Sequence, residues 1–209
     1  MEDYLVPAKA AEAEYIEKRS RFICRVWPVQ SESEAVSRIE EMRKKHYDAT
    51  HNVYAYILRE NGIMRYSDDG EPSGTSGQPT LNVFRAQGIQ NVCCVVTRYF
   101  GGVLLGAGGL VRAYSSAAKL GLEAAGVSMM AQWRIVRIAC TYSQFERVRR
   151  LLEEHEAVVE DTDFAENVDF RALLREDRAD GFSAALTELT NASAVCEFDG
   201  ECFRGVRVK

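Results

Sequence analysis

The residues best suited to chemistry lie between a predicted strand and a long predicted helix. Arg98 and Arg112 flank a cluster of five glycines, which are Gly101, Gly102, Gly106, Gly108 and Gly109. Glycine loses more backbone entropy on folding than other residues, so this density indicates left-handed turns or close backbone contacts. Because a helix start offers unpaired N–H groups and a partial positive charge, we expect an anion site here. Tight packing of the helix on its strand is the alternative explanation.

A second group of candidate residues lies in the segment 67–79. Asp68, Asp69 and Glu71 fall within four residues of one another, beside Gly70 and Pro72. Mg²⁺ uses one or two carboxylates together with phosphate oxygens, so this loop could hold a metal next to an anion on the glycine cluster. The spacing matches no complete metal motif, and an ordered turn with bonded Asp side chains is the preferred interpretation. We therefore predict no cofactor, with Mg²⁺ left as a possibility.

Nucleophilic catalysis has little support in the sequence. The chain has three histidines, and neither a Ser/His/Asp or Cys/His arrangement nor a G-x-S-x-G or Walker pattern can be read from it. His51 precedes an apolar run and could lie near the carboxylate loop, although a hydrogen-bonded structural histidine is the preferred interpretation. We name no catalytic residue and favour a protein that is not an enzyme.

A short basic and aromatic patch is a candidate for nucleic-acid contact. It consists of residues 18–21, Lys-Arg-Ser-Arg, followed by Phe22. Together with Arg98, Tyr99 and Arg112, Arg21 could contact phosphates while Phe22 stacks on a base. A solvated strand edge with protective charge explains residues 18–21 as well and is the more common case.

Composition and charge narrow the class of protein. The chain has 209 residues, 46% of them hydrophobic, and a net charge of −5. Residues 131–209 carry this whole charge, while residues 1–130 are neutral, so nucleic acid would bind the first part. No apolar run approaches the length of a membrane span, and six cysteines without a C-x-x-C pair indicate reduced thiols in a cytoplasmic protein.

Two domains must position these residues. The first alternates strands near 15–26, 53–58 and 92–96 with helices that start at the capping box 31–34, near residue 81 and at residue 110. A boundary is expected at 126–132. Beyond it the order is strand (133–140), helix (143–155), two strands (157–163 and 167–175), helix (177–189) and strand (194–202). This βαββαβ order is that of a ferredoxin-like domain.

Four segments together resemble the IMPACT/YigZ family over essentially the whole chain. They are Ser20-Arg21-Phe22, His51, Asp68-Asp69-Gly70-Glu71-Pro72 with Gly74-Thr75 and Gly77, and Arg98-Tyr99 through Gly109-Leu110-Val111 to Ala113-Tyr114. The resemblance implies an α+β protein. Residues 1–130 would have the fold of ribosomal protein S5 domain 2, and residues 131–209 would form a ferredoxin-like domain similar to the last domain of EF-G. This chain has Gln78 and Ala107 where relatives often carry a basic residue and Thr.

The resemblance also bears on function. Eukaryotic relatives act in translational control by binding the activator of an initiation-factor kinase, and nucleic-acid binding has been suggested for bacterial members from their fold. We therefore expect a non-enzymatic, RNA- or ribosome-associated protein linked to regulation of translation. The alternatives are a phosphate-ligand or nucleotide-binding enzyme that uses the carboxylate loop and the glycine cluster, and an adaptor that docks on a protein partner. The oligomeric state stays open.

The residues expected to form one ligand-binding site combine the groups above. They are Arg21, His51, Asp68, Asp69, Glu71, Arg98, Tyr99, Gly101, Gly102, Gly106, Gly108, Gly109 and Arg112.

Overall fold

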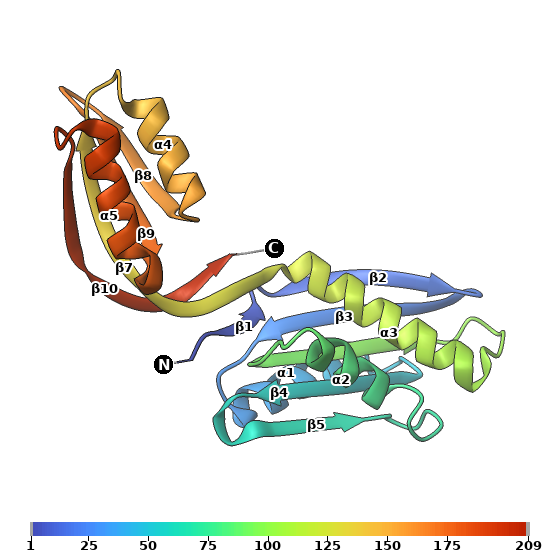
Figure 1. Ribbon diagram of the computed structural model, residues 1–209. Coiled ribbons are helices and arrows are strands. Elements are labelled where there is room, and N and C mark those ends of the chain that lie inside the picture. The colour runs from blue at the N-terminus through green and yellow to red at the C-terminus, as the bar shows by residue number, and fades with distance from the viewer. Residues whose placement is uncertain (1, 208–209) are drawn as a thin grey trace. The chain divides into compact units, whose positions relative to one another are not determined.

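The computed structural model describes residues 2–207, which form two compact units (Figure 1). Tyr4–Met129 make up the N-terminal unit, and Met130–Val206 make up most of the C-terminal unit. Each unit contains a mixed sheet-and-helix core of its own, so the expected α+β class is confirmed. Among the described residues, no helix combines the length and apolar character that a membrane span requires.

The N-terminal unit is built on one antiparallel sheet. Its strands are β2 (Ala11–Glu17), β3 (Ser20–Pro28), β4 (His51–Leu58), β5 (Ile63–Ser67) and β6 (Val92–Tyr99), in the order β2-β3-β6-β4-β5. The short strand β1 (Tyr4–Pro7) and the 3₁₀ turn η1 (Glu60–Gly62) complete this part of the chain. The segment expected as one bent strand or a strand pair is the hairpin of β2 and β3.

Helices cover both faces of this sheet. Helix α1 (Glu32–Lys45) packs on one face, and its N-cap is Ser31, whose side chain accepts a hydrogen bond from Glu34 N–H, as the capping box predicts. Helices α2 (Gly77–Ala86) and α3 (Gly106–Ala125) pack on the other face (Figure 1). The uninterrupted apolar run in β6 follows from this arrangement, because side chains on both faces of that strand are buried.

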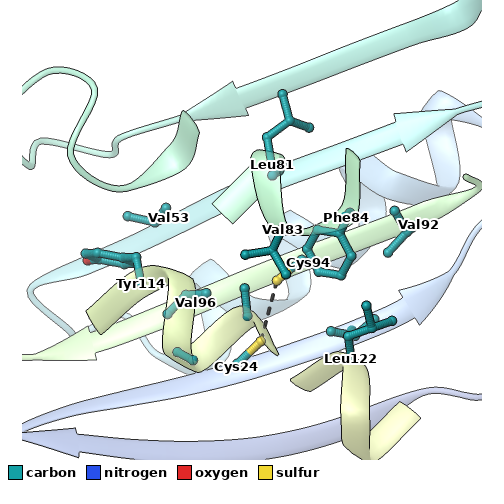
Figure 2. Close-up of a cluster of buried hydrophobic side chains, with 14 of the residues drawn as sticks. Cys24, Val53, Leu81, Val83, Phe84, Val92, Cys94, Val96, Tyr114 and Leu122 are labelled. Carbon is teal, nitrogen blue, oxygen red and sulfur yellow. Dashed lines mark hydrogen bonds between the residues drawn. The ribbon is translucent and has the colours of Figure 1, made fainter. Parts of the chain in front are cut away.

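The core beneath α2 and α3 fixes where α3 lies on the sheet. Cys24 and Cys94 meet there with their Sγ atoms 3.5 Å apart, among valines, Phe84 and Leu122 (Figure 2). A Cβ on Gly121 would lie 2.4 Å from Cys24 Sγ, so α3 can approach the sheet this closely only with glycine at that position. The start of α3 is thereby held over the end of β6 that carries Arg98.

The C-terminal unit has the expected βαββαβ order. Its elements are β7 (Val127–Cys140), α4 (Phe145–Glu154), β8 (Val158–Phe164), β9 (Val168–Arg175), α5 (Glu176–Thr190) and β10 (Val195–Arg207). The strands run in the order β7-β9-β8, and β10 pairs with β7, which is the ferredoxin-like arrangement. The segment 126–132 was expected as a boundary between domains. Most of it is strand, since β7 begins at Val127.

Candidate functional site

The carboxylate loop between β5 and α2 is held together by Asp68. One oxygen of this carboxylate accepts hydrogen bonds from Ser76 N–H (3.1 Å), Ser76 O–H (2.7 Å) and Gly77 N–H (2.8 Å), and the other from Gly74 N–H (2.8 Å). Burial works against ionisation, but these hydrogen bonds outweigh it and lower the pKa of Asp68. Asp68 therefore orders the turn, as the preferred interpretation had it.

Asp69 attaches the same loop to β4. Its Oδ2 accepts a hydrogen bond from Asn52 N–H at 2.6 Å, and its Oδ1 lies 3.4 Å from the Arg43 guanidinium. The residue sits in the left-handed region with φ of 46°, which Asp tolerates better than most residues. These contacts bring the following residues, Gly70 and Glu71, under the start of α3.

Glu71 is the centre of a buried polar cluster. Its Oε1 accepts a hydrogen bond from the Arg98 guanidinium at 2.6 Å and another from Tyr114 O–H at 2.8 Å. The side chains of Glu71 and Arg98 are only 3% and 6% exposed, so the two charges neutralise each other away from solvent. Burial, followed by the neighbouring carboxylate, raises the pKa of Tyr114, which therefore remains a proton donor.

His51 lies beside this cluster, and a hydrogen bond fixes which of its ring nitrogens carries the proton. Nδ1 lies 2.7 Å from the carbonyl oxygen of Asp69, and since a carbonyl only accepts, Nδ1 carries the proton. Nε2 faces Glu71, 3.8 Å from its Oε2. Gly70 packs under the ring, where an added Cβ would stand 3.5 Å from Nδ1. The loop thus sets both the tautomer and the orientation of His51.

A cavity of about 440 Å³ opens above these groups. Its polar wall includes His51, Glu71 and Arg98, and the start of α3 contributes Gly106 and Ala107. The remaining lining is mostly apolar: Pro72, Phe100, Leu104, Leu105 and Leu110, with Thr50 and Gly70. A concave, largely apolar site with a few convergent polar groups is the usual form of a small-molecule pocket.

Two features of this pocket concern its ability to attract an anion. Arg98 has a buried Nε with no hydrogen-bond partner among the described residues, and its guanidinium lies 5.4 Å from the ring centre of Phe22 and 5.6 Å from that of Phe100. The N-cap of α3 is Leu105, which provides no side-chain cap, so N–H groups of the first turn are left for another acceptor. Both features favour a carboxylate or phosphate group in the cavity.

The five glycines of the cluster have different structural roles. Gly101 is a packing glycine, because a Cβ there would lie 2.1 Å from the Arg19 carbonyl carbon. Gly102 and Gly106 adopt φ of 83° and 70°, and Gly106 lines the pocket. Gly109 packs against Leu105, while at Gly108 a Cβ would meet only the end of Arg112. Close packing therefore explains Gly101 and Gly109, while the anion site stays a prediction that concerns Gly106.

Of the thirteen residues expected to form one site, His51, Glu71, Arg98 and Gly106 line this pocket. Among the others, three have side chains that face elsewhere, two of them because of strand alternation. Arg21 pairs with Tyr99 across β3 and β6, whereas Phe22 pairs with Arg98. Neighbouring residues of a strand point to opposite faces, so Arg21 and Tyr99 face away from the pocket. Arg21 forms a two-pronged ion pair with Glu14, both bonds 3.0 Å long. Phe22 is fully buried against Tyr114, so it is a core residue and no platform for a base.

Arg112 is the third separated residue. Its side chain lines a second cavity, between β2 and α3, and not the pocket that holds His51 and Arg98. Its position follows from helix geometry, since Arg112 lies two residues beyond Leu110 and thus on a different side of α3.

Tyr99 belongs to a hydrogen-bond chain on the α1 face of the sheet. Arg25 donates to Nε2 of His46 at 2.7 Å, so Nδ1 of His46 carries the proton and donates to the hydroxyl oxygen of Tyr99 at 2.9 Å. Tyr99 in turn donates to Asp48 at 3.1 Å. Burial, followed by the charge of Arg25, lowers the pKa of His46, because a second ring proton would face the guanidinium.

The sequence analysis did not include two buried polar residues that belong to the site. Tyr114 and Ser20 both belong to the sequence segments that carry the family resemblance, which was the available signal. Ser20 Oγ accepts hydrogen bonds from Gly101 N–H (3.1 Å) and Arg98 (3.5 Å). The apolar walls at Leu104 and Phe100 carried no signal in the sequence.

Within residues 2–207, no group of three or more His, Cys, Asp or Glu side chains is arranged to hold a metal ion.

Fold and site together define a two-domain α+β protein with a buried Glu–Arg pair under the start of a glycine-rich helix. Residues 18–122 match the Impact N-terminal domain, and residues 138–193 match a domain of unknown function (DUF1949). The chain therefore belongs to the IMPACT family.

Relatives of similar length support this assignment. The chain is 39% identical to IMPACT family member YvyE of Bacillus subtilis over 195 residues, which cover 93% of this chain and 90% of that protein. It is 31% identical to IMPACT family member YigZ of Escherichia coli, with 92% and 96% covered. A crystal structure described as that of a hypothetical protein matches with a TM-score of 0.59 and 30% identity, covering 94% of this chain and 97% of that one. The similarity to Protein IMPACT of Rattus norvegicus, 32% over 108 residues, covers 48% of this chain and 33% of the rat protein.

Proposed function

We propose that this protein binds a small anionic ligand, a carboxylate or phosphate attached to an apolar group, in the pocket at the start of α3. The observation that carries the proposal is that the uncapped start of α3 and the Arg98 side chain meet at one cavity, and that Arg98 Nε has no hydrogen-bond partner among the described residues. The uncapped helix start supplies a second attraction for negative charge. Leu104, Leu105 and Phe100 would cover the apolar part of the ligand.

Binding rather than catalysis is the function that these residues support best. Glu71 is engaged by Arg98 and Tyr114, so its Oε1 has two donors already. Among residues 2–207, the cavity lining contains no Ser or Cys, and its single hydroxyl side chain is Thr50. Apart from the engaged Glu71, His51 is the one lining side chain in this range that could act as a general base. A cytoplasmic location fits the six free cysteines of the chain, since such thiols persist in reducing compartments.

Ala107 offers a substitution that tests the pocket without disturbing the buried cluster. It is exposed, lines the cavity and lies in the first turn of α3. A carboxylate in Ala107→Asp would complement the helix dipole by about 0.3–1 kcal/mol, so the variant should fold, while repelling an anion from the pocket. Ala107→Asn is the matched neutral control.

The test is thermal unfolding in the presence of small carboxylates and phosphate monoesters that carry an apolar group. A compound present at 100 times its Kd should stabilise the wild type by about 2.7 kcal/mol. We expect this stabilisation to persist in Ala107→Asn and to be lost in Ala107→Asp. Equal stabilisation of both variants, or none of the wild type by any compound, would contradict the proposal.

An RNA- or ribosome-associated role in regulation of translation is the second candidate. Outside the pocket, the residues expected to contact RNA were Arg21, Tyr99 and Arg112. Arg21 is paired with Glu14, and Tyr99 is hydrogen-bonded to His46 and Asp48, so Arg112 is the one of the three whose contacts favour RNA binding. Purification with and without nuclease, followed by analysis of bound RNA, tests this role. Absence of RNA from the untreated preparation would count against it.

A further inference from the structure

A second cavity, of about 320 Å³, lies between the end of β2 and the outer side of α3. Its polar lining comprises Lys18, Arg112 and Lys119 together with Glu17, Ser115 and Ser116. We propose that this cavity binds the phosphate groups of a ligand, independently of the pocket on the other side of the α3 start. Leu105 lines both cavities and stands between them.

The positive charges in this cavity are not balanced by the protein. None of Lys18, Arg112 and Lys119 forms an ion pair with a carboxylate in the described part of the chain, whereas Arg21, Arg25 and Arg98 of the same unit are all paired. The single carboxylate in the lining, Glu17, accepts a hydrogen bond from Tyr15 O–H at 2.9 Å. Three cations thus face one carboxylate, which leaves the cavity with an excess of positive charge.

Helix geometry brings the cationic groups together. Arg112, Ser116 and Lys119 are spaced by four and three residues, so they share one side of α3. Lys18 approaches from the β2–β3 turn and completes the cavity. Ammonium, guanidinium and hydroxyl groups are the donors that proteins use for phosphate oxygens.

The turn that presents Lys18 is held in an unusual backbone conformation. Lys18 and Arg19 have φ of 45° and 69°, in a two-residue hairpin turn of the kind that favours Asn-Gly. The turn is fixed from outside, because Gly101 donates to Ser20 Oγ at 3.1 Å and packs on the Arg19 backbone. A cationic side chain, Lys18, at a strained position on a turn that a glycine loop anchors fits a role in ligand binding.

Phosphate groups could come from a free phosphorylated molecule or from an RNA backbone, and two probes separate these sources. Tripolyphosphate represents the first, and a fluorescent ten-nucleotide oligouridylate represents the second. Binding of each is measured at low and moderate salt for the wild type and for Arg112→Gln/Lys119→Gln. The control, Lys44→Gln/Arg85→Gln, removes the same two charges at exposed positions outside the cavity.

We expect at least one probe to bind the wild type, about tenfold more tightly than Arg112→Gln/Lys119→Gln, with the control variant close to the wild type. If the source is RNA, the oligouridylate binds, and losing two contacts lowers its salt slope by about 1.4. If the source is a small molecule, tripolyphosphate binds and the oligouridylate does not. Equal weakening in both double variants, or binding of neither probe at low salt, would overturn the proposal. Because none of these residues except Leu105 lines the other pocket, failure here leaves the small-ligand function standing.

Discussion

Removing the negative charge of Glu71 should destabilise the N-terminal unit strongly. In Glu71→Gln the side chain keeps its volume and an oxygen for Tyr114, but the Arg98 guanidinium, 6% exposed, loses its counter-charge. Breaking a buried ion pair by removing one partner costs about 3–5 kcal/mol, and the retained hydrogen bond places this variant near 3 kcal/mol. For a domain of this size, that loss corresponds to roughly 10 °C in Tm.

A double-mutant cycle separates this effect from lost packing. Arg98→Met alone leaves a buried carboxylate, whereas Glu71→Gln/Arg98→Met leaves no uncompensated charge, so the double variant should be more stable than either single one. Urea unfolding is followed by Trp27 fluorescence in a Trp133→Phe background, because Trp27 lies in the N-terminal unit. A Glu71→Gln variant within about 1 kcal/mol of the wild type, or strictly additive losses, would refute the reasoning.

Three further predictions follow from local geometry. Gly101→Ala should cost about 3 kcal/mol because its Cβ would meet backbone atoms, whereas Gly108→Ala should gain up to about 1 kcal/mol because its Cβ would meet only the end of the Arg112 side chain; urea denaturation compares the two. The pKa of His46 is lowered on folding, so its contribution to stability is full above the unfolded value of 6.5 and is lost as the pH falls through the folded value. The wild type should therefore lose more stability between pH 7.5 and pH 5 than His46→Gln, and parallel losses would contradict this. In the folded protein, iodoacetamide should modify only the partly exposed Cys196 and Cys202, as mass spectrometry would show, and rapid reaction of the four buried thiols would contradict the packing.

Much of the architecture could be predicted because it depends on local patterns. The doubly buried strand in β6 was visible as an apolar run, and the start of α1 was visible in Ser31 and Glu34. The βαββαβ order of the C-terminal unit could be read from alternating periodicities and capping signals. These features need no knowledge of which segments meet in space.

The site was only partly predictable because it depends on register and on tertiary contacts. Arg98 and Tyr99 are neighbours in one strand, so they could not both face the pocket, but the sequence did not show which one does. The strand was expected to end at Val96, yet it continues to Tyr99, because Asn52 on the neighbouring strand β4 bonds Thr97 and Glu71 in the carboxylate loop bonds Arg98. Helix α3 begins at Gly106 and not at Leu110, since packing overrides the low helix propensity of glycine.

The most direct test of the proposed ligand site is NMR titration of ¹⁵N-labelled protein with the most strongly stabilising compound from the thermal screen. We predict that the largest amide shift changes occur in Gly106 and Ala107, with accompanying changes at His51. Largest changes at residues outside the pocket lining, or the absence of any saturable change, would contradict the assignment of the pocket.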